Sequence, residues 1–250
     1  MSKRQHVQRV ACPTGSENGS ASVKVTEIYK SIQGEGFLTG TECVFVRASG
    51  CNLRCRFCDT PYASWEPEGQ DLSVPEIVAE VDAMRADHVV ITGGEPMLFA
   101  EMIPLCTDLH RQRIHITIET AGTLYLPVAC DLMSISPKLS NSTPEKAPDP
   151  KWHLRHERSR HVPDVLEKLI GEFHYQFKFV IDSAADVDEV ELYLTQFPAI
   201  DRSRVMLMPE GTTTEDLQVT GRWLANYCQQ HSLSFCPRRH IEWFGLARGT

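Results

Sequence analysis

Three cysteines within eight residues constrain this 250-residue chain more than any other feature of its sequence. Cys51, Cys55 and Cys58 form the pattern Cys-x3-Cys-x2-Cys. Three thiolates on one short loop can bind three irons of a 4Fe-4S cluster, which normally takes four cysteine ligands. The fourth iron is then free to coordinate a small molecule, so the pattern predicts an open, reactive cluster. The alternative is a structural zinc site with a distant fourth ligand, although the sequence has no second Cys-x2-Cys unit.

The composition limits the class of protein. The formal net charge is −8, which argues against general nucleic-acid binding because such binding usually shows a basic surface. No apolar run approaches the roughly 18 residues needed to span a bilayer, and no secretory segment follows Met1. We therefore expect a cytoplasmic protein without membrane or nucleic-acid partners. In that reducing compartment we expect the other six cysteines to be buried free thiols: Cys12, Cys43, Cys106, Cys130, Cys228 and Cys236.

Strand and helix patterns alternate along the chain after a polar, flexible tail expected at 1–22. The expected strands are 23–30, 42–48, 88–92, 114–119, 132–136, 176–181, 204–208 and 233–236, and the expected helices are 73–86, 101–111, 184–196 and 214–231. Such alternation predicts βα units and a parallel sheet. We therefore predict an α/β fold in which residues 23–250 form a single domain, an incomplete TIM-type barrel of about six parallel strands.

One stretch breaks this alternation. Residues 139–166 contain four prolines and three histidines, and the stretch is long for a connection between a strand and a helix. We expect it to be a surface insertion. Metal binding by its histidines is the alternative.

Four polar motifs directly follow four of the expected strands. They are the cysteine loop, Thr92-Gly-Gly-Glu-Pro96, Ile118-Glu-Thr-Ala-Gly122 and Ser136-Pro-Lys138. Because the chemistry of barrel enzymes lies at the carboxyl ends of the strands, we expect these motifs to share one face. The glycine pair would let backbone groups approach a ligand closely, as the binding of an amino-acid moiety requires.

These motifs resemble those of the radical S-adenosylmethionine superfamily, and the resemblance covers nearly all of the chain after residue 23. Within that superfamily the sequence is most similar to the 7-carboxy-7-deazaguanine synthase family. The further matching segments are Ser31-Ile-Gln-Gly-Glu-Gly36, Phe45-Val-Arg47, Cys58-Asp-Thr60 and Met208-Pro-Glu-Gly211. The first of these discriminates best, because most radical enzymes lack it.

The resemblance implies a reaction and its cofactors. The free iron of a 4Fe-4S cluster would chelate S-adenosylmethionine, and reductive cleavage would release a 5′-deoxyadenosyl radical that abstracts hydrogen from the substrate. The family rearranges 6-carboxy-5,6,7,8-tetrahydropterin to 7-carboxy-7-deazaguanine with loss of ammonia, in queuosine and related 7-deazapurine biosynthesis. The resemblance also implies Mg²⁺, a reductant such as flavodoxin or ferredoxin, and a homodimer.

The same resemblance implies roles for individual residues. The pterin site would be formed by Ile32, Gln33, Gly34, Glu35, Arg47, Thr92, Glu119 and His240. S-adenosylmethionine would be contacted by Phe57, Asp59, Gly94, Ser136, Pro137, Lys138, Met208 and Pro209. Thr60 holds the position that contacts magnesium in the family. Arg47 would pair with the substrate carboxylate, a role suited to a planar, two-pronged donor.

Other interpretations stay open. The structural alternatives are a rim ion pair for Arg47, a pairing with Lys138 or Lys178 for Glu119, and turn hydrogen bonds for Thr60, Gln33 and Glu35. Two other functions are a different radical enzyme, such as a glycyl-radical activating enzyme, and a zinc-stabilised interaction domain without catalytic activity. The first of these acts on a large protein and would not need the Ser-Ile-Gln-Gly-Glu-Gly segment.

Overall fold

Nine strands form one open sheet in the computed structural model, which describes residues 22–250. The tail expected at 1–22 therefore lies outside the described residues, apart from Ser22. In sheet order the strands are β3 (Gln70–Ser73), β1 (Ser22–Ile32), β2 (Glu42–Ala48), β4 (His88–Gly93), β5 (His115–Thr120), β6 (Leu132–Ile135), β7 (Tyr175–Ile181), β8 (Val205–Pro209) and β9 (Ser234–Phe235). β1 pairs antiparallel with both β2 and β3. The strands β2 and β4 to β9 run parallel to one another.

The parallel strands confirm the predicted incomplete barrel. They number seven rather than about six, and the last of them, β9, which was expected at 233–236, is only two residues long. β3 was not predicted, since its sequence Gln-Asp-Leu-Ser is polar and lacks the β-branched residues typical of strands. It forms by pairing with the start of β1.

Alternation along the parallel strands gives the sheet two different faces. One set of positions packs into the main hydrophobic core: Val44, Val46, Val89, Ile91, Ile116, Ile118, Phe177 and Phe179. The positions between them line a cavity on the concave face and include Arg47, Thr92, Glu119 and Lys178. A spacing of two residues therefore places the polar residues of separate motifs on one side.

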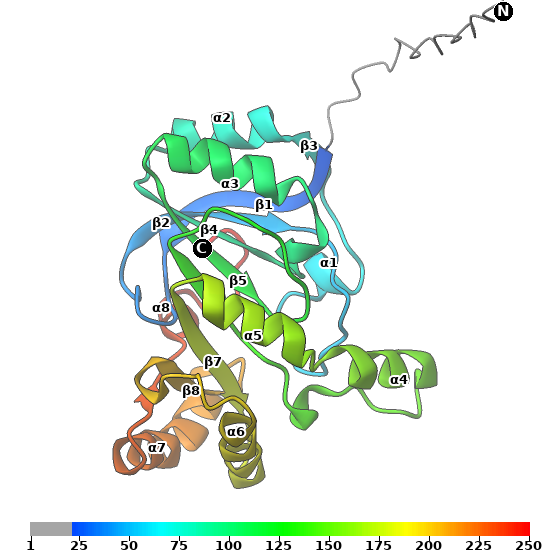
Figure 1. Cartoon of the computed structure of the whole chain (residues 1–250), viewed down its shortest axis with the longest axis vertical. Coiled ribbons are helices and arrows are strands. Elements are labelled where there is room, and N and C mark those ends of the chain that lie inside the picture. The colour runs from blue at the N-terminus through cyan, green and yellow to red at the C-terminus, as the bar shows by residue number, and fades with distance from the viewer. Residues whose placement is uncertain (1–21) are drawn as a thin grey trace, which may run out of the picture.

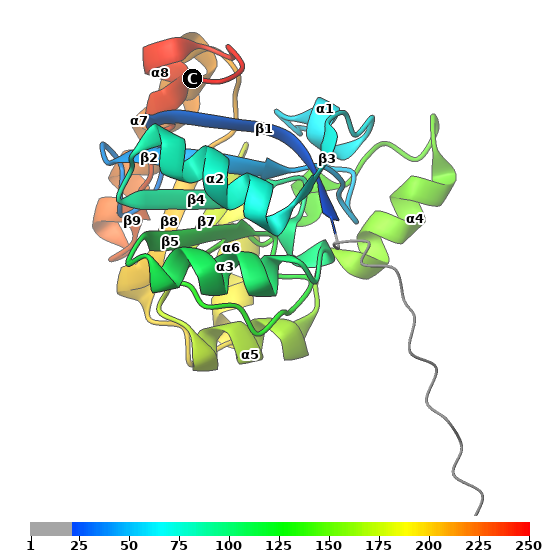
Figure 2. The same cartoon turned by 90° about the horizontal axis from the view of Figure 1, so that it is seen from above.

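Helices cover the outer, apolar face of the sheet, as Figures 1 and 2 show. The longer ones are α2 (Val74–Met84), α3 (Met102–Arg111), α5 (Pro163–Glu172), α6 (Ala184–Gln196) and α7 (Thr214–Gln230). α2 packs on β1 and α3, α6 packs on β7, and α7 packs on β8 and β9. The shorter helices are α1 (Pro61–Ser64), α4 (Pro150–Ser159), α8 (Arg239–Phe244) and the 3-10 helices η1 (Pro96–Leu98), η2 (Ser140–Ser142) and η3 (Arg202–Arg204).

The predicted helix starts agree closely with the structure. Ser73 caps α2, and Glu76 Oε2 accepts hydrogen bonds from the Ser73 backbone nitrogen at 2.8 Å and from its hydroxyl at 2.6 Å. The helix ends at Met84, two residues before the expected end, because Arg85 has a left-handed backbone with φ of 50°. The helices expected at 101–111, 184–196 and 214–231 correspond to α3, α6 and α7.

The stretch 139–166 contains η2, α4 and the first turn of α5. α4 projects away from the rest of the molecule in both views (Figures 1 and 2). α5 instead buries Leu166 and Leu169 in the main core. Neither helix was predicted, because the prolines suggested a loop. Pro150 and Pro163 are the first residues of their helices, where the missing N–H of proline costs nothing.

Candidate active site

A cavity of about 280 Å³ lies at the carboxyl ends of the parallel strands, on the concave face. It is lined by all three cysteines of the cluster motif and by nearly all the other residues expected in the site. Those others are Ile32, Gln33, Gly34, Glu35, Arg47, Phe57, Asp59, Thr60, Thr92, Gly94, Glu119, Ser136, Lys138, Met208 and His240. Pro137 and Pro209 do not line it, although each adjoins a residue that does.

The cysteine loop (51–58) presents three free thiols to this cavity. A turn closes the loop, since the Cys58 backbone nitrogen donates to the Cys55 carbonyl at 3.1 Å. Burial raises the pKa of Cys51 to about 12 and that of Cys55 to about 11. These thiols are therefore protonated at neutral pH without a metal, and binding of iron must displace their protons.

The donor set suits a cluster better than a single ion. Across residues 22–250 no group of three or more His, Cys, Asp or Glu side chains is arranged to hold one metal ion. Three soft thiolates on one short loop that all line the cavity fit a cluster in which each sulfur binds a different iron.

The two glycines of the Thr-Gly-Gly-Glu-Pro motif allow the end of β4 to touch the backbone that leads into the cysteine loop. Gly93 has φ of +144°, and a Cβ atom there would lie 2.2 Å from the Ala48 carbonyl oxygen. A Cβ on Gly94 would lie 2.2 Å from the Gly50 carbonyl oxygen. The Glu95 backbone nitrogen donates to that same oxygen at 2.8 Å. The glycines therefore serve backbone packing as well as any ligand.

Glu95 ties the ends of two neighbouring strands together. Its side chain is fully buried and accepts hydrogen bonds from the Thr120 hydroxyl and the Ala121 backbone nitrogen, both at 2.8 Å, and from the Met97 nitrogen at 3.1 Å. Burial raises the pKa of this carboxyl group. Glu95 thus holds the motif after β4 against the one after β5.

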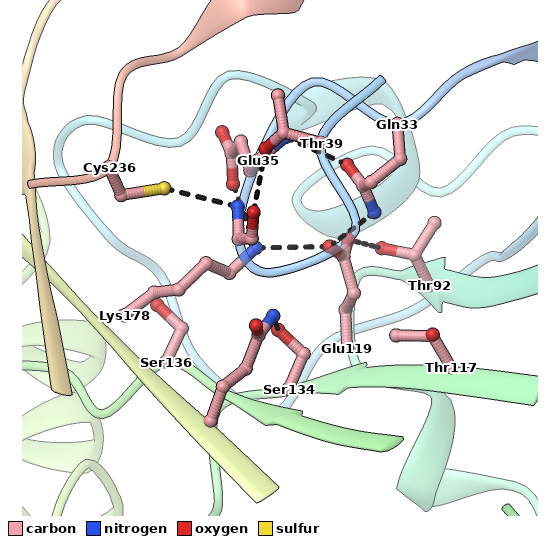
Figure 3. A network of polar contacts seen from close by, with 12 residues as sticks. Gln33, Glu35, Thr39, Thr92, Thr117, Glu119, Ser134, Ser136, Lys178 and Cys236 are labelled. Atoms are coloured by element: carbon pink, nitrogen blue, oxygen red, sulfur yellow. Dashed lines mark hydrogen bonds and ion pairs between the residues drawn. The ribbon is translucent and has the colours of Figure 1, made fainter. Parts of the chain in front are cut away.

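A buried lysine joins two carboxylates at the floor of the cavity (Figure 3). Lys178 Nζ lies 2.8 Å from Glu35 Oε2 and 3.0 Å from Glu119 Oε1. The other oxygen of Glu119 accepts from the Thr92 hydroxyl at 2.9 Å, and Gln33 Nε2 donates to Oε1 at 3.4 Å. Burial alone would raise the pKa of Glu35, but Lys178 and Arg238 outweigh it and hold that pKa well below its usual value.

Arg238 connects three separate segments beside this floor. Its guanidinium lies 3.1 Å from Glu35 Oε1, pairs with Asp59 of the cysteine segment, and donates to the Gly211 carbonyl at 2.9 Å. His240 Nδ1 lies 3.8 Å from the same Glu35 oxygen. Burial lowers the pKa of His240, so its imidazole is neutral at neutral pH. The chain's C-terminal segment thereby becomes part of the site.

Arg47 is held by a protein carboxylate on the opposite wall. Its Nε lies 2.6 Å from Glu27 Oε1, and its Nη2 donates to the Tyr29 hydroxyl at 2.9 Å. The Tyr62 hydroxyl donates to the same Glu27 oxygen at 3.2 Å. The rim ion pair considered from the sequence is therefore present, and it leaves the Nη1 edge of the guanidinium without a hydrogen bond to any of residues 22–250.

Smaller polar contacts complete the wall beside the cysteines. Lys138 Nζ donates to the Ser136 hydroxyl at 2.7 Å and to its carbonyl at 2.8 Å. The Thr60 hydroxyl lies 3.9 Å from Cys58 Sγ. Thr60 is the N-cap residue of α1, but its hydroxyl makes no capping hydrogen bond, so it stays available to a ligand.

The segment after β6 supports the cysteine loop from outside. His156 of α4 is fully buried, and its Nδ1 accepts a hydrogen bond from the Arg54 backbone nitrogen at 3.1 Å. Its Nε2 lies 2.9 Å from the Ser142 hydroxyl. The Ser142 carbonyl accepts from the Arg56 backbone nitrogen at 2.9 Å. Two backbone groups between the cysteines are therefore fixed by residues about a hundred positions later.

Sequence reasoning missed several residues that line the cavity. They are Glu27, Tyr29, Tyr62, Arg238 and the stretch 245–250, while Lys178 was considered only as a partner of Glu119. Lys178 could have been found from the alternation of β7, because it interrupts an apolar run. Arg238 has no local signal, since its partners are distant in the sequence.

Comparison with protein families and curated relatives identifies strong similarities. The family model described as "Radical SAM superfamily" matches residues 45–171. A 7-carboxy-7-deazaguanine synthase from Rhodopirellula baltica is 41% identical over 239 residues, covering 95% of this chain and 93% of the relative. A protein of the same name from Halobacterium salinarum is also 41% identical over 239 residues, covering 92% of this chain and 93% of the relative.

A solved structure supports the fold. The crystal structure of QueE from Escherichia coli superposes with a TM-score of 0.66 at 22% identity, covering 88% of this chain and 95% of that one. Among residues 22–250, no helix has the length and apolar character that crossing a membrane requires.

Proposed function

Because the chain belongs to the 7-carboxy-7-deazaguanine synthase family of the radical S-adenosylmethionine superfamily, we propose that it converts 6-carboxy-5,6,7,8-tetrahydropterin to 7-carboxy-7-deazaguanine with loss of ammonia. The observation that carries this proposal is that one cavity is lined both by the three thiols and by a set of fixed charged residues. Three free thiols line one side, and a fixed set of carboxylates and cations lines the other.

Cys51, Cys55 and Cys58 would hold the cluster. With S-adenosylmethionine bound, a 4Fe-4S cluster supplies a one-electron reductive cleavage that yields the 5′-deoxyadenosyl radical. The residues proposed to orient S-adenosylmethionine are Phe57, Asp59, Gly94, Ser136, Lys138 and Met208, with Pro137 and Pro209 shaping the backbone beside them. Lys138 would meet a carboxylate of that ligand by leaving its present Ser136 partners.

The floor of the cavity would bind the pterin. An aminopyrimidinone ring presents adjacent N–H donors, and Glu119 offers a carboxylate already oriented by Thr92 and Lys178. Gln33 and Glu35 lie beside it with both donors and acceptors. Ile32, Gly34 and His240 would complete this side. Buried polar groups at fixed positions discriminate well against analogues that cannot pair with them.

Arg47 would bind the carboxylate of the substrate. One edge of its guanidinium is free of hydrogen bonds to residues 22–250, while Glu27 and Tyr29 hold the rest of it in place. Arg47→Lys should therefore raise KM strongly, because a lysine cannot replace a planar donor that serves two partners at once. A glycyl-radical activating enzyme would have no use for this arginine.

The decisive experiment is a direct assay of the reaction. The protein is reconstituted anaerobically with iron and sulfide and incubated with dithionite, S-adenosylmethionine, Mg²⁺ and 6-carboxytetrahydropterin. Mass spectrometry should detect 7-carboxy-7-deazaguanine, and Cys55→Ala should make none. Cleavage of S-adenosylmethionine without change in the pterin would leave the superfamily in place and refute the substrate.

Mg²⁺ would bind through the Thr60 hydroxyl together with substrate oxygens. Magnesium prefers hard oxygen ligands and keeps several waters, so a single protein oxygen suffices. Thr60→Val keeps the shape of the side chain and removes this oxygen. We expect it to raise the Mg²⁺ concentration needed for half-maximal rate while leaving iron content unchanged. An unchanged Mg²⁺ dependence would refute the assignment.

Two further features belong to this proposal. The protein would act as a homodimer, which light scattering after size-exclusion chromatography tests directly.

The protein would work in the cytoplasm with a one-electron reductant such as flavodoxin or ferredoxin. The eight cysteines of the described chain are all free, and a reducing compartment keeps them so.

A further inference from the structure

One face of α4 carries an unpaired basic stripe. Lys151, Leu154, Arg155 and Arg158 follow the spacing i, i+3, i+4, i+7, which places them on the same side of a helix. All four are exposed, and Leu154 keeps 50% of its accessible surface. None of the three bases forms an ion pair or a side-chain hydrogen bond with another residue of the described chain, 22–250.

The carboxylates of this helix are engaged elsewhere, so they do not neutralise the stripe. Asp149 caps the helix by accepting from the backbone nitrogens of Lys151 and Trp152, both at 3.1 Å. Glu157 lies 3.0 Å from Arg160 and accepts from the Thr143 hydroxyl. The stripe is therefore a local positive surface on a chain whose formal net charge is −8.

The flank of α4 beside this stripe contacts the loop that carries the cluster ligands. The Arg54 guanidinium stacks 4.0 Å from the centre of the Trp152 ring, and Arg155 lies 4.6 Å from the same ring. Arg54 is between two cysteines in the sequence, and its Nη1 donates to the Cys51 carbonyl at 3.0 Å. A partner seated on the stripe would thus reach the cysteine loop through Trp152 and Arg54.

We propose that this surface, defined by Arg54, Lys151, Leu154, Arg155 and Arg158, is the docking site of a small acidic one-electron carrier protein. The reaction class requires an external electron for each cleavage of S-adenosylmethionine, so some surface near the cysteines must receive a donor. In the docked pair the carrier loses one electron, the cluster gains it, and no atoms are transferred. Opposite charges steer the encounter, and the exposed Leu154 supplies apolar contact.

A nucleic acid is a poorer match for the same surface. Its affinity grows with the number of phosphates neutralised, and four bases on an otherwise acidic chain neutralise few. A carrier protein needs only a small, transient interface. The charge pattern and its position beside the cysteine loop favour the carrier.

The test compares two electron sources in one enzyme. The triple variant Lys151→Glu/Arg155→Glu/Arg158→Glu is measured against the wild type and against Arg222→Glu, an exposed arginine of α7. Purified flavodoxin is the probe. Its binding to the reconstituted protein is followed by calorimetry at low and high salt. Formation of 5′-deoxyadenosine is measured with reduced flavodoxin and, separately, with dithionite.

We expect the triple variant to bind flavodoxin about tenfold or more weakly and to lose flavodoxin-driven cleavage to a similar extent. Its iron content and dithionite-driven cleavage should equal those of the wild type, and Arg222→Glu should change neither. Equal flavodoxin binding by the triple variant, an equal loss in Arg222→Glu, or no binding of flavodoxin by the wild type at low salt would each overturn the proposal. Because 5′-deoxyadenosine forms without the pterin, a wrong substrate assignment would not alter this result.

Discussion

Lys178 balances the charge of two carboxylates on the floor of the cavity. Its side chain is 4% exposed, and its Nζ lies within 3.0 Å of both Glu35 and Glu119. Removal of one member of a buried ion pair leaves a charge without compensation, which costs about 3 to 5 kcal/mol. We expect Lys178→Met to lower the free energy of unfolding at pH 7 by roughly that amount and to abolish pterin conversion.

The pH dependence of this loss has a definite sign. The pKa of Glu35 is held low in the folded wild type, so its contribution to stability is present above pH 4.5 and is lost as pH falls below that value. In the variant the uncompensated carboxylate binds a proton at a higher pH. The stability gap between the two proteins should therefore shrink as pH falls toward 4, as urea denaturation would measure. Lys168→Met, an exposed lysine of α5, is the control, and a gap independent of pH would contradict the argument.

Two glycines form a matched pair of substitutions with opposite expected effects. A Cβ on Gly94 would meet backbone atoms of Gly50 and Ala63, which flank the cysteine loop, whereas a Cβ on Gly171 of α5 would meet nothing within 4 Å. We expect Gly94→Ala to lower stability and iron content together. Gly171→Ala should raise stability by about 0.5 to 1 kcal/mol, because alanine favours the helix. Thermal unfolding and an iron assay measure both, and a Gly94→Ala protein with full iron content would refute the packing role.

At the scale of elements, α4 acts as a support for the cysteine loop through His156. We expect His156→Ala to expose the Arg54 amide, so that its hydrogen exchange becomes at least about tenfold faster, which corresponds to roughly 1.4 kcal/mol of lost protection. The cluster should also be lost faster under air. His156→Asn, which keeps a short acceptor, should restore part of the protection. If the amide exchanges at the wild-type rate in His156→Ala, the hydrogen bond does not hold the loop.

The elements that the sequence predicted well are those whose signal is local. Period-two runs and the Ser73 cap gave strands and helix starts close to the observed ones, because alternation and capping depend on near neighbours. β3 was not predicted because its hydrogen bonds are made with β1, about 50 residues earlier in the chain. The helices α4 and α5 were not predicted because Pro150 and Pro163 were counted as part of a surface insertion and not as first helical residues.

At the scale of the molecule, the cavity is assembled from contacts that no local pattern records. Motifs at strand ends were predicted to meet because a parallel sheet brings its carboxyl ends together, and they do. Arg238 instead bridges Glu35 and Asp59, which are 203 and 179 residues away. Such a link depends on where the last segment crosses the barrel. It becomes visible only when the whole chain is folded.

The stability of the whole molecule should weaken in mild acid because of His88, which is buried beneath the barrel at the start of β4. Its Nε2 lies 2.9 Å from the Thr117 hydroxyl, and its ring packs edge-on against His115 at 4.7 Å. Burial, followed by the nearby His115, lowers the pKa of His88 to about 4. The unfolded chain binds a proton near pH 6.5 and the folded protein only near pH 4, so stability falls as pH drops through this window.

This single histidine should remove about 2 kcal/mol of unfolding free energy between pH 7 and pH 5. His88→Gln keeps a polar side chain beside Thr117 and cannot titrate in this range. Between pH 7 and pH 5 it should therefore lose about 2 kcal/mol less unfolding free energy than the wild type loses. His110→Gln, at an exposed position of α3, should behave as the wild type does. Anaerobic urea denaturation at the two pH values measures all three proteins. If His88→Gln and the wild type lose equal stability, folding does not change the protonation of His88. That result would contradict the claim that burial lowers the pKa of His88.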